Sequence, residues 1–180
     1  MSLCPRFRRD LGRLREIKGW GPVRAFLDAV LLDSAFQALM WYRIGSACRR
    51  GRIPLLPAVC RRVGVAFSGA DILPTARIGA GCYLVHGVGL VIGGGSVVGE
   101  DCTILHGVTL GEGSFDDTAC PTVGDRVTIG VGAKVLGGVT VGDGAFIGAG
   151  AVVLDDVPAG HVAVGMPATS RPIAPAADPG

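Results

Sequence analysis

A six-residue period dominates the second half of the chain. From residue 123 to residue 153 a branched aliphatic residue stands at every sixth position, and glycine follows directly at four of them. The members are Val123, Ile129, Val135, Val141, Ile147 and Val153. A period of six is neither the period of a helix nor the continued alternation of a long strand. The chain is therefore expected to run a short strand, turn a corner and repeat.

The same period continues toward the N-terminus. It runs through Ile72, Ile78, Leu84 and Leu90, then resumes two residues out of phase through Ile92, Val98, Ile104 and Leu110. Three short strands with inward aliphatics would close a three-sided coil of about 18 residues, and coils would stack about 4.8 Å apart. We expect about four coils in a parallel β-helix, because a β-sandwich does not explain six in-register hexads. Residues 111–122 form an excursion that interrupts the period.

The amino-acid composition of the chain limits the fold classes that it can adopt. Of 180 residues, 49% are hydrophobic, only 6% are aromatic and 30 are glycine. This excludes a disordered chain, and it indicates a core of small aliphatic side chains rather than a helical bundle. Charge is divided: residues 1–70 carry a net +9 and residues 71–180 a net −7. Two differently built segments therefore share the chain.

The first segment is expected to be helical. Apolar residues recur near helical spacing over Pro22–Ile44, and a second short helix is expected from Ala58 to about Phe67. We divide the chain into a basic helical segment (1–70), a β-helix (71–172) and a tail (173–180). The arginine pairs of the first segment are expected to be solvated or to meet the acidic half. A basic surface for anionic lipid is the alternative, and no motif for specific nucleic-acid recognition accompanies the charge.

Cysteine usage bears on the compartment. The six cysteines are scattered without a Cys-x-x-Cys pair, and no early apolar segment typical of a signal peptide precedes them. We expect a cytoplasmic protein whose thiols mainly fill the core. The longest apolar stretch is interrupted by charged residues, which argues against a transmembrane span.

Five motifs within Asp71–Pro172 carry a family resemblance. They are DILPTARIG (71–79), HGVGLVIG (86–93), HGVTLG (106–111), PTVGDRVTIGVGAKVLG (121–137) and VGMPA (164–168). Together they resemble the hexapeptide-repeat acyltransferases, and within them the serine acetyltransferase group. The resemblance implies a left-handed parallel β-helix, acetyl-CoA as donor, and a homotrimer, with a dimer of trimers as the larger alternative.

The chain has only three histidines to serve as a general base. The resemblance implies that His86 is the base and that Asp71 orients it. His106 follows His86 by 20 residues, one coil plus the phase shift, so both rings should lie on one face of adjacent coils. His106 is expected to line the acceptor pocket or to form a stacked surface pair. No metal is expected, and His161 is interpreted as structural.

The resemblance also implies a donor site. In such enzymes the pantetheine arm lies along the β-helix between subunits, close to glycines and small residues. The matching positions are Gly111, Val131, Gly132 and Ala149. Arg171 is a candidate for a CoA phosphate on charge alone. The 111–122 excursion is expected to cover the groove.

Departures from the family pattern bear on the acceptor. Val85 replaces the aspartate that precedes the catalytic histidine, and Leu73 replaces a second histidine. The Arg-His pair that holds the acceptor's carboxylate reads Ala119-Cys120 here, so Val85 and Cys120 stand at substrate-binding positions. The loop instead carries acidic residues, which disfavour a carboxylate. They are Glu112, Asp116 and Asp117.

The resulting hypothesis is an acetyl-CoA-dependent O-acetyltransferase whose acceptor is serine, a serine-like compound or another hydroxyl compound. Cys120 as a nucleophile is disfavoured, because acidic residues flank it. Two alternatives remain open: a sugar or glycan O-acetyltransferase at a membrane surface, and a non-catalytic trimeric β-helix scaffold. The Pro/Ala-rich C-terminus lacks the isoleucine with which serine acetyltransferases dock into their sulfhydrylase partner, so that partner is not expected.

Overall fold

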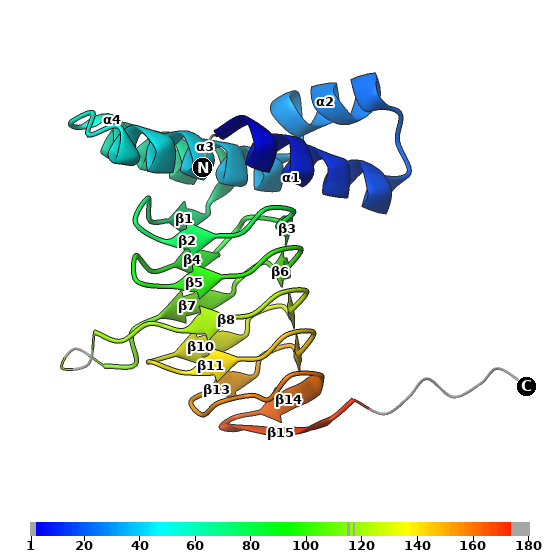
Figure 1. The fold of residues 1–180 in the computed structure, drawn as a ribbon, viewed down its shortest axis with the longest axis vertical. Helices are drawn as coiled ribbons and strands as arrows, with labels where there is room; N and C mark the ends of the chain where they lie inside the picture. The colour runs from blue at the N-terminus through cyan, green and yellow to red at the C-terminus, as the bar shows by residue number, and fades with distance from the viewer. Residues whose placement is uncertain (1–2, 115, 117, 174–180) are drawn as a thin grey trace, which may run out of the picture.

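The computed structural model describes residues 3–173 apart from 115 and 117. Its helices form a layer over one end of a stack of short strands (Figure 1). They are α1 (Leu3–Lys18), α2 (Pro22–Leu31), α3 (Ser34–Arg50) and α4 (Leu56–Ser68). Within the described range, none of them combines the length and apolar character needed to cross a membrane.

The strands form the three sides of a parallel β-helix. Sheet A has the order β1 (Asp71–Ile72), β4 (Val91–Ile92), β7 (Thr109–Gly111), β10 (Lys134–Leu136), β13 (Val152–Val153). Sheet B has the order β2 (Arg77–Ile78), β5 (Val97–Val98), β8 (Thr122–Val123), β11 (Thr140–Val141). Sheet C has the order β3 (Tyr83–Val85), β6 (Thr103–Leu105), β9 (Thr128–Ile129), β12 (Phe146–Ile147), β14 (His161–Gly165), β15 (Ala168–Pro172). Among the described strands, only the last pair, β14 with β15, is antiparallel.

The periodic aliphatics fill the core, as the sequence predicts. All six from Val123 to Val153 are at most 1% exposed. The expectation of four coils is wrong, because sheet A has five strands. The fifth coil does not follow the six-residue period, because Val157 follows Val153 by four residues rather than six. Val157 nevertheless continues sheet B through a bridge to Val141.

The phase shift has a structural cause. The corner between β3 and β4 runs over residues 86–90, whereas the corresponding corner between β6 and β7 runs over residues 106–108. Two extra residues therefore follow His86, and Leu84 pairs with Ile104 across the coils. The register stays intact because the extra residues lie entirely in the corner.

One helix prediction is wrong and one is confirmed. The single helix expected over residues 22–44 is broken between α2 and α3. The Asp33 carboxylate accepts a hydrogen bond from the Phe36 N–H at 2.9 Å and so begins a new helix. The short helix expected near residues 58–67 is present as α4.

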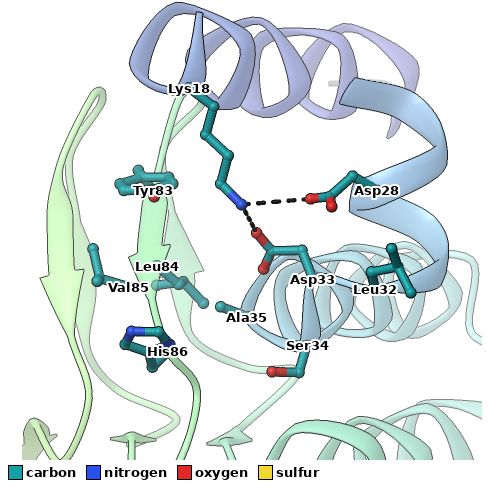
Figure 2. Close-up of a pocket in the computed structure, with 10 residues that line it drawn as sticks. All are labelled: Lys18, Asp28, Leu32, Asp33, Ser34, Ala35, Tyr83, Leu84, Val85 and His86. Carbon is teal, nitrogen blue, oxygen red and sulfur yellow. Dashed lines mark hydrogen bonds and ion pairs between the residues drawn. The ribbon is translucent and has the colours of Figure 1, made fainter. Parts of the chain in front are cut away.

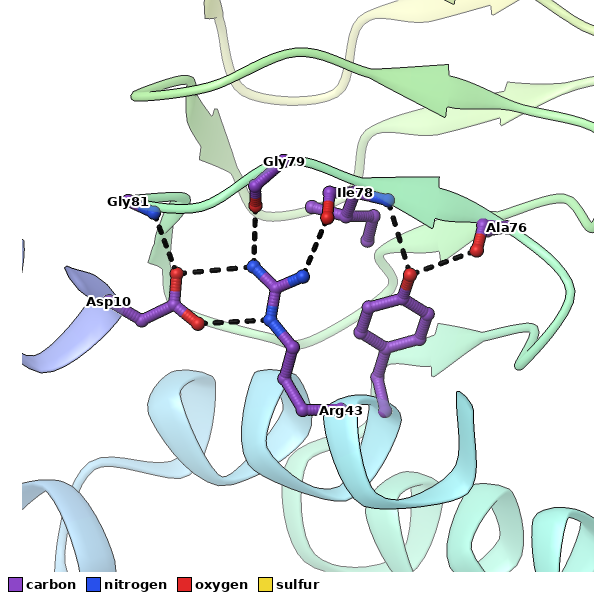
Figure 3. A network of polar contacts seen from close by, with 7 residues as sticks. Asp10, Arg43, Ala76, Ile78, Gly79 and Gly81 are labelled. Atoms are coloured by element: carbon purple, nitrogen blue, oxygen red, sulfur yellow. Dashed lines mark hydrogen bonds and ion pairs between the residues drawn. The ribbon is translucent and has the colours of Figure 1, made fainter. Parts of the chain in front are cut away.

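Two side chains of α3 join the helical layer to the first coil (Figure 3). The Tyr42 hydroxyl donates to the Ala76 carbonyl at 2.9 Å and accepts from the Ile78 N–H at 3.1 Å. Arg43 donates to the Ile78 and Gly79 carbonyls, at 2.6 and 2.5 Å. The helices thus satisfy backbone groups at the open end of the β-helix, which would otherwise present an unpaired strand edge.

Candidate active site

His86 occupies a strained corner of the first coil. It follows β3 directly, and its φ of 57° lies in the left-handed region, which non-glycine residues rarely adopt. Such conformations cost about 1–3 kcal/mol and concentrate at functional sites. The structure therefore holds this imidazole in place at a cost in stability.

His106 lies one coil further along the same edge. Val85 pairs with Leu105, and the rings that follow them have centroids 5.9 Å apart with their planes at 66°. The spacing prediction that the two histidines share one face of adjacent coils is confirmed.

His86 lines a pocket of about 300 Å³ beneath the helical layer, here named the His86 pocket. Figure 2 shows β3 forming one wall, while the end of α1 and the α2–α3 connection form the other. The lining residues are Lys18, Asp28, Leu32, Asp33, Ser34, Ala35, Tyr83, Leu84, Val85 and His86. Val85 thus stands beside His86 in a cavity large enough for a small molecule.

Three charged residues face His86 across this pocket. The Lys18 ammonium donates to Asp33 at 2.9 Å and lies 3.4 Å from Asp28 (Figure 2). Burial disfavours the charged ammonium, but the hydrogen bond and charge of Asp33, with those of Asp28, outweigh it and raise the pKa of Lys18. With both carboxylates ionised, the group carries a net negative charge.

Sequence reasoning missed these three residues. They come from α1, α2 and the α2–α3 connection, and no motif marks them. The available signal was Asp33 itself, an N-cap residue type inside an apolar helical pattern.

Asp71 opens β1 and is held by α4. Both of its carboxylate oxygens accept from the Arg61 guanidinium, at 2.5 Å each. That hydrogen bonding, partly opposed by burial, keeps the pKa of Asp71 below its usual range. The Asp71 N–H donates to the Leu90 carbonyl, so Asp71 borders the corner that begins at His86. The Asp71 carboxylate nevertheless binds Arg61 rather than His86.

Three positions matched to the acetyl-CoA site lie along the same edge of the β-helix as His86 and His106. They are Val131, Gly132 and Ala149. The Gly132 N–H donates to the His106 carbonyl at 2.9 Å, and the Gly150 N–H donates to Val131 at 2.8 Å. Ala149 directly precedes that glycine. Gly111 lies elsewhere, at the far end of β7, and Arg171 is exposed on β15 opposite Val162.

Cys120 lies across sheet A from His86. A Cβ atom placed on Gly95, in the corner after β4, would be 3.0 Å from the Cys120 sulfur. His86 stands in the corner before β4, so one chain does not bring these two positions together. Leu73 also lies at the Cys120 side, against Gly94. Asp117 and the C-terminal residues 174–180 lie outside the described range.

Two of the other cysteines behave as core residues. Cys82 and Cys102 are buried and free, and burial raises the pKa of Cys102 to about 11. Among the described residues, no group of three or more His, Cys, Asp or Glu side chains is placed to hold a metal ion.

Known proteins with similar sequences and structures identify the family of this chain. Residues 120–155 match the family described as bacterial transferase hexapeptide (six repeats). A serine acetyltransferase of Mycobacterium tuberculosis is 52% identical over 161 residues, which cover 89% of this chain and 69% of that protein. The solved Neisseria gonorrhoeae serine acetyltransferase in complex with serine has a TM-score of 0.83 at 35% identity, covering 93% of this chain and 68% of that one. The Brucella abortus enzyme in complex with coenzyme A has a TM-score of 0.84 at 32% identity, covering 93% and 66%. The chain belongs to the serine acetyltransferase family of hexapeptide-repeat acyltransferases.

Proposed function

We propose that this protein transfers an acetyl group from acetyl-CoA to the hydroxyl of a small acceptor, with His86 as general base. The observation that carries the proposal is His86 itself, held in a left-handed conformation at the wall of a pocket. Membership of the family supports the reaction class, and the coenzyme A complex of the Brucella relative supports the donor.

The reaction proceeds by direct attack. The His86 imidazole takes the proton from the acceptor hydroxyl while its oxygen bonds to the thioester carbonyl carbon. The tetrahedral intermediate then collapses, its C–S bond breaks, and the CoA sulfur receives the proton from His86. Backbone N–H groups near Gly111 are proposed to stabilise the oxyanion, and because Gly111 lies at the far end of β7 within one chain, they would come from a neighbouring copy.

Asp71 is proposed to orient His86 and stabilise its protonated form. Its position beside the His86 corner and its lowered pKa support this role, because an orienting carboxylate must be ionised. His106 is proposed to line the path between acceptor and donor, since the donor positions Val131, Gly132 and Ala149 follow it along the same edge.

The His86 pocket is proposed to hold the acceptor. Asp28 and Asp33 suit an ammonium group, and Lys18 suits a carboxylate, so the pocket matches a zwitterionic hydroxy amino acid such as serine. Lys18 would then take the place of the arginine and histidine that are Ala119 and Cys120 here.

A neutral sugar or polyol is the second candidate. Val85 brings no charge to the pocket, and the three charged groups opposite it already pair with one another. Carboxylates that accept hydrogen bonds also suit sugar hydroxyls.

We propose a homotrimer as the functional unit, as the resemblance to the hexapeptide-repeat acyltransferases implies. The separation of Cys120 from His86 within one chain supports this, because Cys120 can stand at the substrates of His86 only if a neighbouring copy supplies it. Light scattering after gel filtration measures the mass directly, and a monomer with full activity would contradict it.

Release of free CoA from acetyl-CoA tests the function. Wild-type protein is assayed with L-serine, its neutral and cationic analogues, and a panel of sugars. His86→Asn is expected to lose at least about 100-fold in kcat while acetyl-CoA binds unchanged. His161→Asn is the control, because His161 lies on β14 with Nδ1 2.9 Å from the Ala159 carbonyl. Undiminished turnover in His86→Asn would remove the assignment, and absent turnover with every acceptor would favour a scaffold.

A further inference from the structure

The C-terminal end of α4 packs against the corner that begins at His86. A Cβ atom placed on Gly87 would lie 2.9 Å from the Ser68 carbonyl oxygen, which leaves no space between them. The Gly89 N–H also donates to the Gly69 carbonyl at 3.1 Å. The helix end and the corner that carries the proposed base are therefore in direct contact.

The same helix also holds Asp71. Arg61 Nε and Nη2 donate to the two oxygens of the Asp71 carboxylate, at 2.5 Å each. The Asp71 N–H in turn donates to the Leu90 carbonyl at 2.8 Å, at the far end of the His86 corner. One helix thus contacts both the corner of the proposed base and the carboxylate proposed to orient it.

The bidentate contact leaves the carboxylate able to accept another hydrogen bond. A carboxylate offers about four lone-pair sites, and Arg61 uses one on each oxygen of Asp71. The Asp71 side chain is 32% exposed, so part of it stays accessible to a further donor. A planar guanidinium fork fixes the orientation of a carboxylate as well as its charge. Arg61 can therefore hold Asp71 in place while Asp71 accepts from an imidazole N–H.

We propose that Arg61 is a positioning residue for the reaction, which fixes the Asp71 carboxylate toward His86 and whose positive charge weakens the attraction between Asp71 and a protonated imidazole. The inference rests on the proposed function, because it gives Arg61 a part in the work of the proposed base. Only the neutral imidazole accepts a proton from the acceptor. Arg61 would keep His86 in that form at a lower pH than an unpaired carboxylate would allow.

Other charged groups face these residues. The hydrogen bond and charge of Arg61 lower the pKa of Asp71, burial partly opposes them, and the Arg62 charge adds a smaller effect in the same direction. The His106 ring lies beside that of His86 on the next coil. The opposite wall of the His86 pocket carries three more charged residues, Lys18, Asp28 and Asp33. All of them stay in place when Arg61 alone is changed.

Titration of the His86 imidazole by NMR, on the full chain without substrates, tests the inference. The chain has three histidines, and His86→Asn identifies the signal of His86. In Arg61→Gln the midpoint of this titration is expected to move to higher pH by at least about 0.5 unit, because Asp71 then attracts the imidazolium unopposed. Thermal unfolding confirms that each variant is folded over the titrated range.

Arg62→Gln is the matched control. It removes the same charge from the next position of α4, where the side chain acts on Asp71 through charge alone, so a smaller shift of the midpoint is expected. An unchanged midpoint in Arg61→Gln, or an equal shift in Arg62→Gln, would overturn the proposal.

Arg61→Lys separates the charge from the guanidinium fork. Lysine keeps the positive charge but cannot pair with both oxygens in one plane, so the midpoint should stay within about 0.2 unit of the wild type while kcat falls about tenfold and KM for acetyl-CoA is unchanged. Wild-type kcat in Arg61→Lys would overturn the positioning role. A shifted midpoint in Arg61→Gln, in a protein that acetylates no tested acceptor, would support the link between Arg61 and His86 and contradict only the proposed function.

Discussion

At the scale of single residues, the left-handed backbone at His86 lowers the stability of the fold and holds the imidazole at the wall of the pocket. The same corner also holds Gly89 in the left-handed region, and Gly107 and Gly132 stack on Gly89 in the next coils, so His86 is an additional left-handed residue there. Glycine adopts that conformation without the steric cost that a Cβ atom imposes. His86→Gly is therefore expected to stabilise the fold by about 1 kcal/mol while abolishing turnover.

Urea unfolding followed by circular dichroism measures this gain. His86→Asn should lie between glycine and the wild type in stability, because asparagine tolerates the left-handed region better than most residues. A loss of stability in His86→Gly would show that imidazole contacts outweigh the backbone strain.

Asp33 gives a residue-scale test of acceptor recognition. Asp33→Asn retains an N-cap side chain for α3 but removes one negative charge beside Lys18. If the acceptor's ammonium binds here, KM for L-serine should rise about tenfold or more, with little change in KM for acetyl-CoA. A neutral acceptor should show no such rise. An unchanged KM for serine would exclude Asp33 from ammonium recognition.

At the scale of elements, the sequence predicts the coils better than it predicts the connections. The hexad aliphatics give the inward face, and the 20-residue spacing gives the stacked histidines, because strand registers repeat from coil to coil. The α2–α3 break was missed since one N-cap aspartate overrode a continuous apolar pattern. The left-handed turn at His86, the Arg61–Asp71 pair and the charged wall of the His86 pocket all depend on tertiary contacts that no local period encodes.

The Arg61–Asp71 pair ties α4 to β1 and makes a pH-dependent contribution. Because the folded pKa of Asp71 is lowered, the pair stabilises the protein above the unfolded pKa of about 3.9 and loses this effect as pH falls through the folded value. Arg61→Gln should therefore cost up to about 1 kcal/mol near pH 7, since both side chains are partly exposed. Urea unfolding across about pH 2.5–7 should show the two proteins converging at the acid end, below the unfolded pKa of about 3.9. A constant difference would mean that the pair is not the cause.

The glycines at the corners between sheets B and C allow the coils to approach. A Cβ atom on Gly99 would lie 2.5 Å from the backbone of Gly124 in the next coil, closer than atoms can pack. Gly99→Ala is thus expected to destabilise the β-helix by about 3 kcal/mol. Gly12→Ala is the control: Gly12 lies within α1 with no atom near its Cβ position, so this change should stabilise by about 0.5–1 kcal/mol. Equal effects in thermal unfolding would contradict the close approach.

At the scale of the whole molecule, one buried ion pair joins the helical layer to the β-helix. Arg43 binds Asp10 through two hydrogen bonds of 3.0 and 3.1 Å, and the Gly81 N–H donates to Asp10 at 2.8 Å (Figure 3). Both charged side chains are about 2% exposed. Burial raises the pKa of Asp10, while Arg43 and the backbone N–H oppose that rise. Residues from α1, α3 and the first coil therefore depend on one another.

A pair of variants measures this dependence. Arg43→Met leaves the Asp10 carboxylate buried without its partner and also removes the donors to the Ile78 and Gly79 carbonyls. The expected loss is about 3–5 kcal/mol in urea unfolding. Asp10→Leu/Arg43→Met removes the unpaired charge and should recover part of that loss. It should remain below the wild type, since those carbonyls still lack donors and the Gly81 N–H loses its acceptor. If the double variant is no more stable than Arg43→Met, the ion pair does not couple the two halves, and packing alone holds the helices on the β-helix.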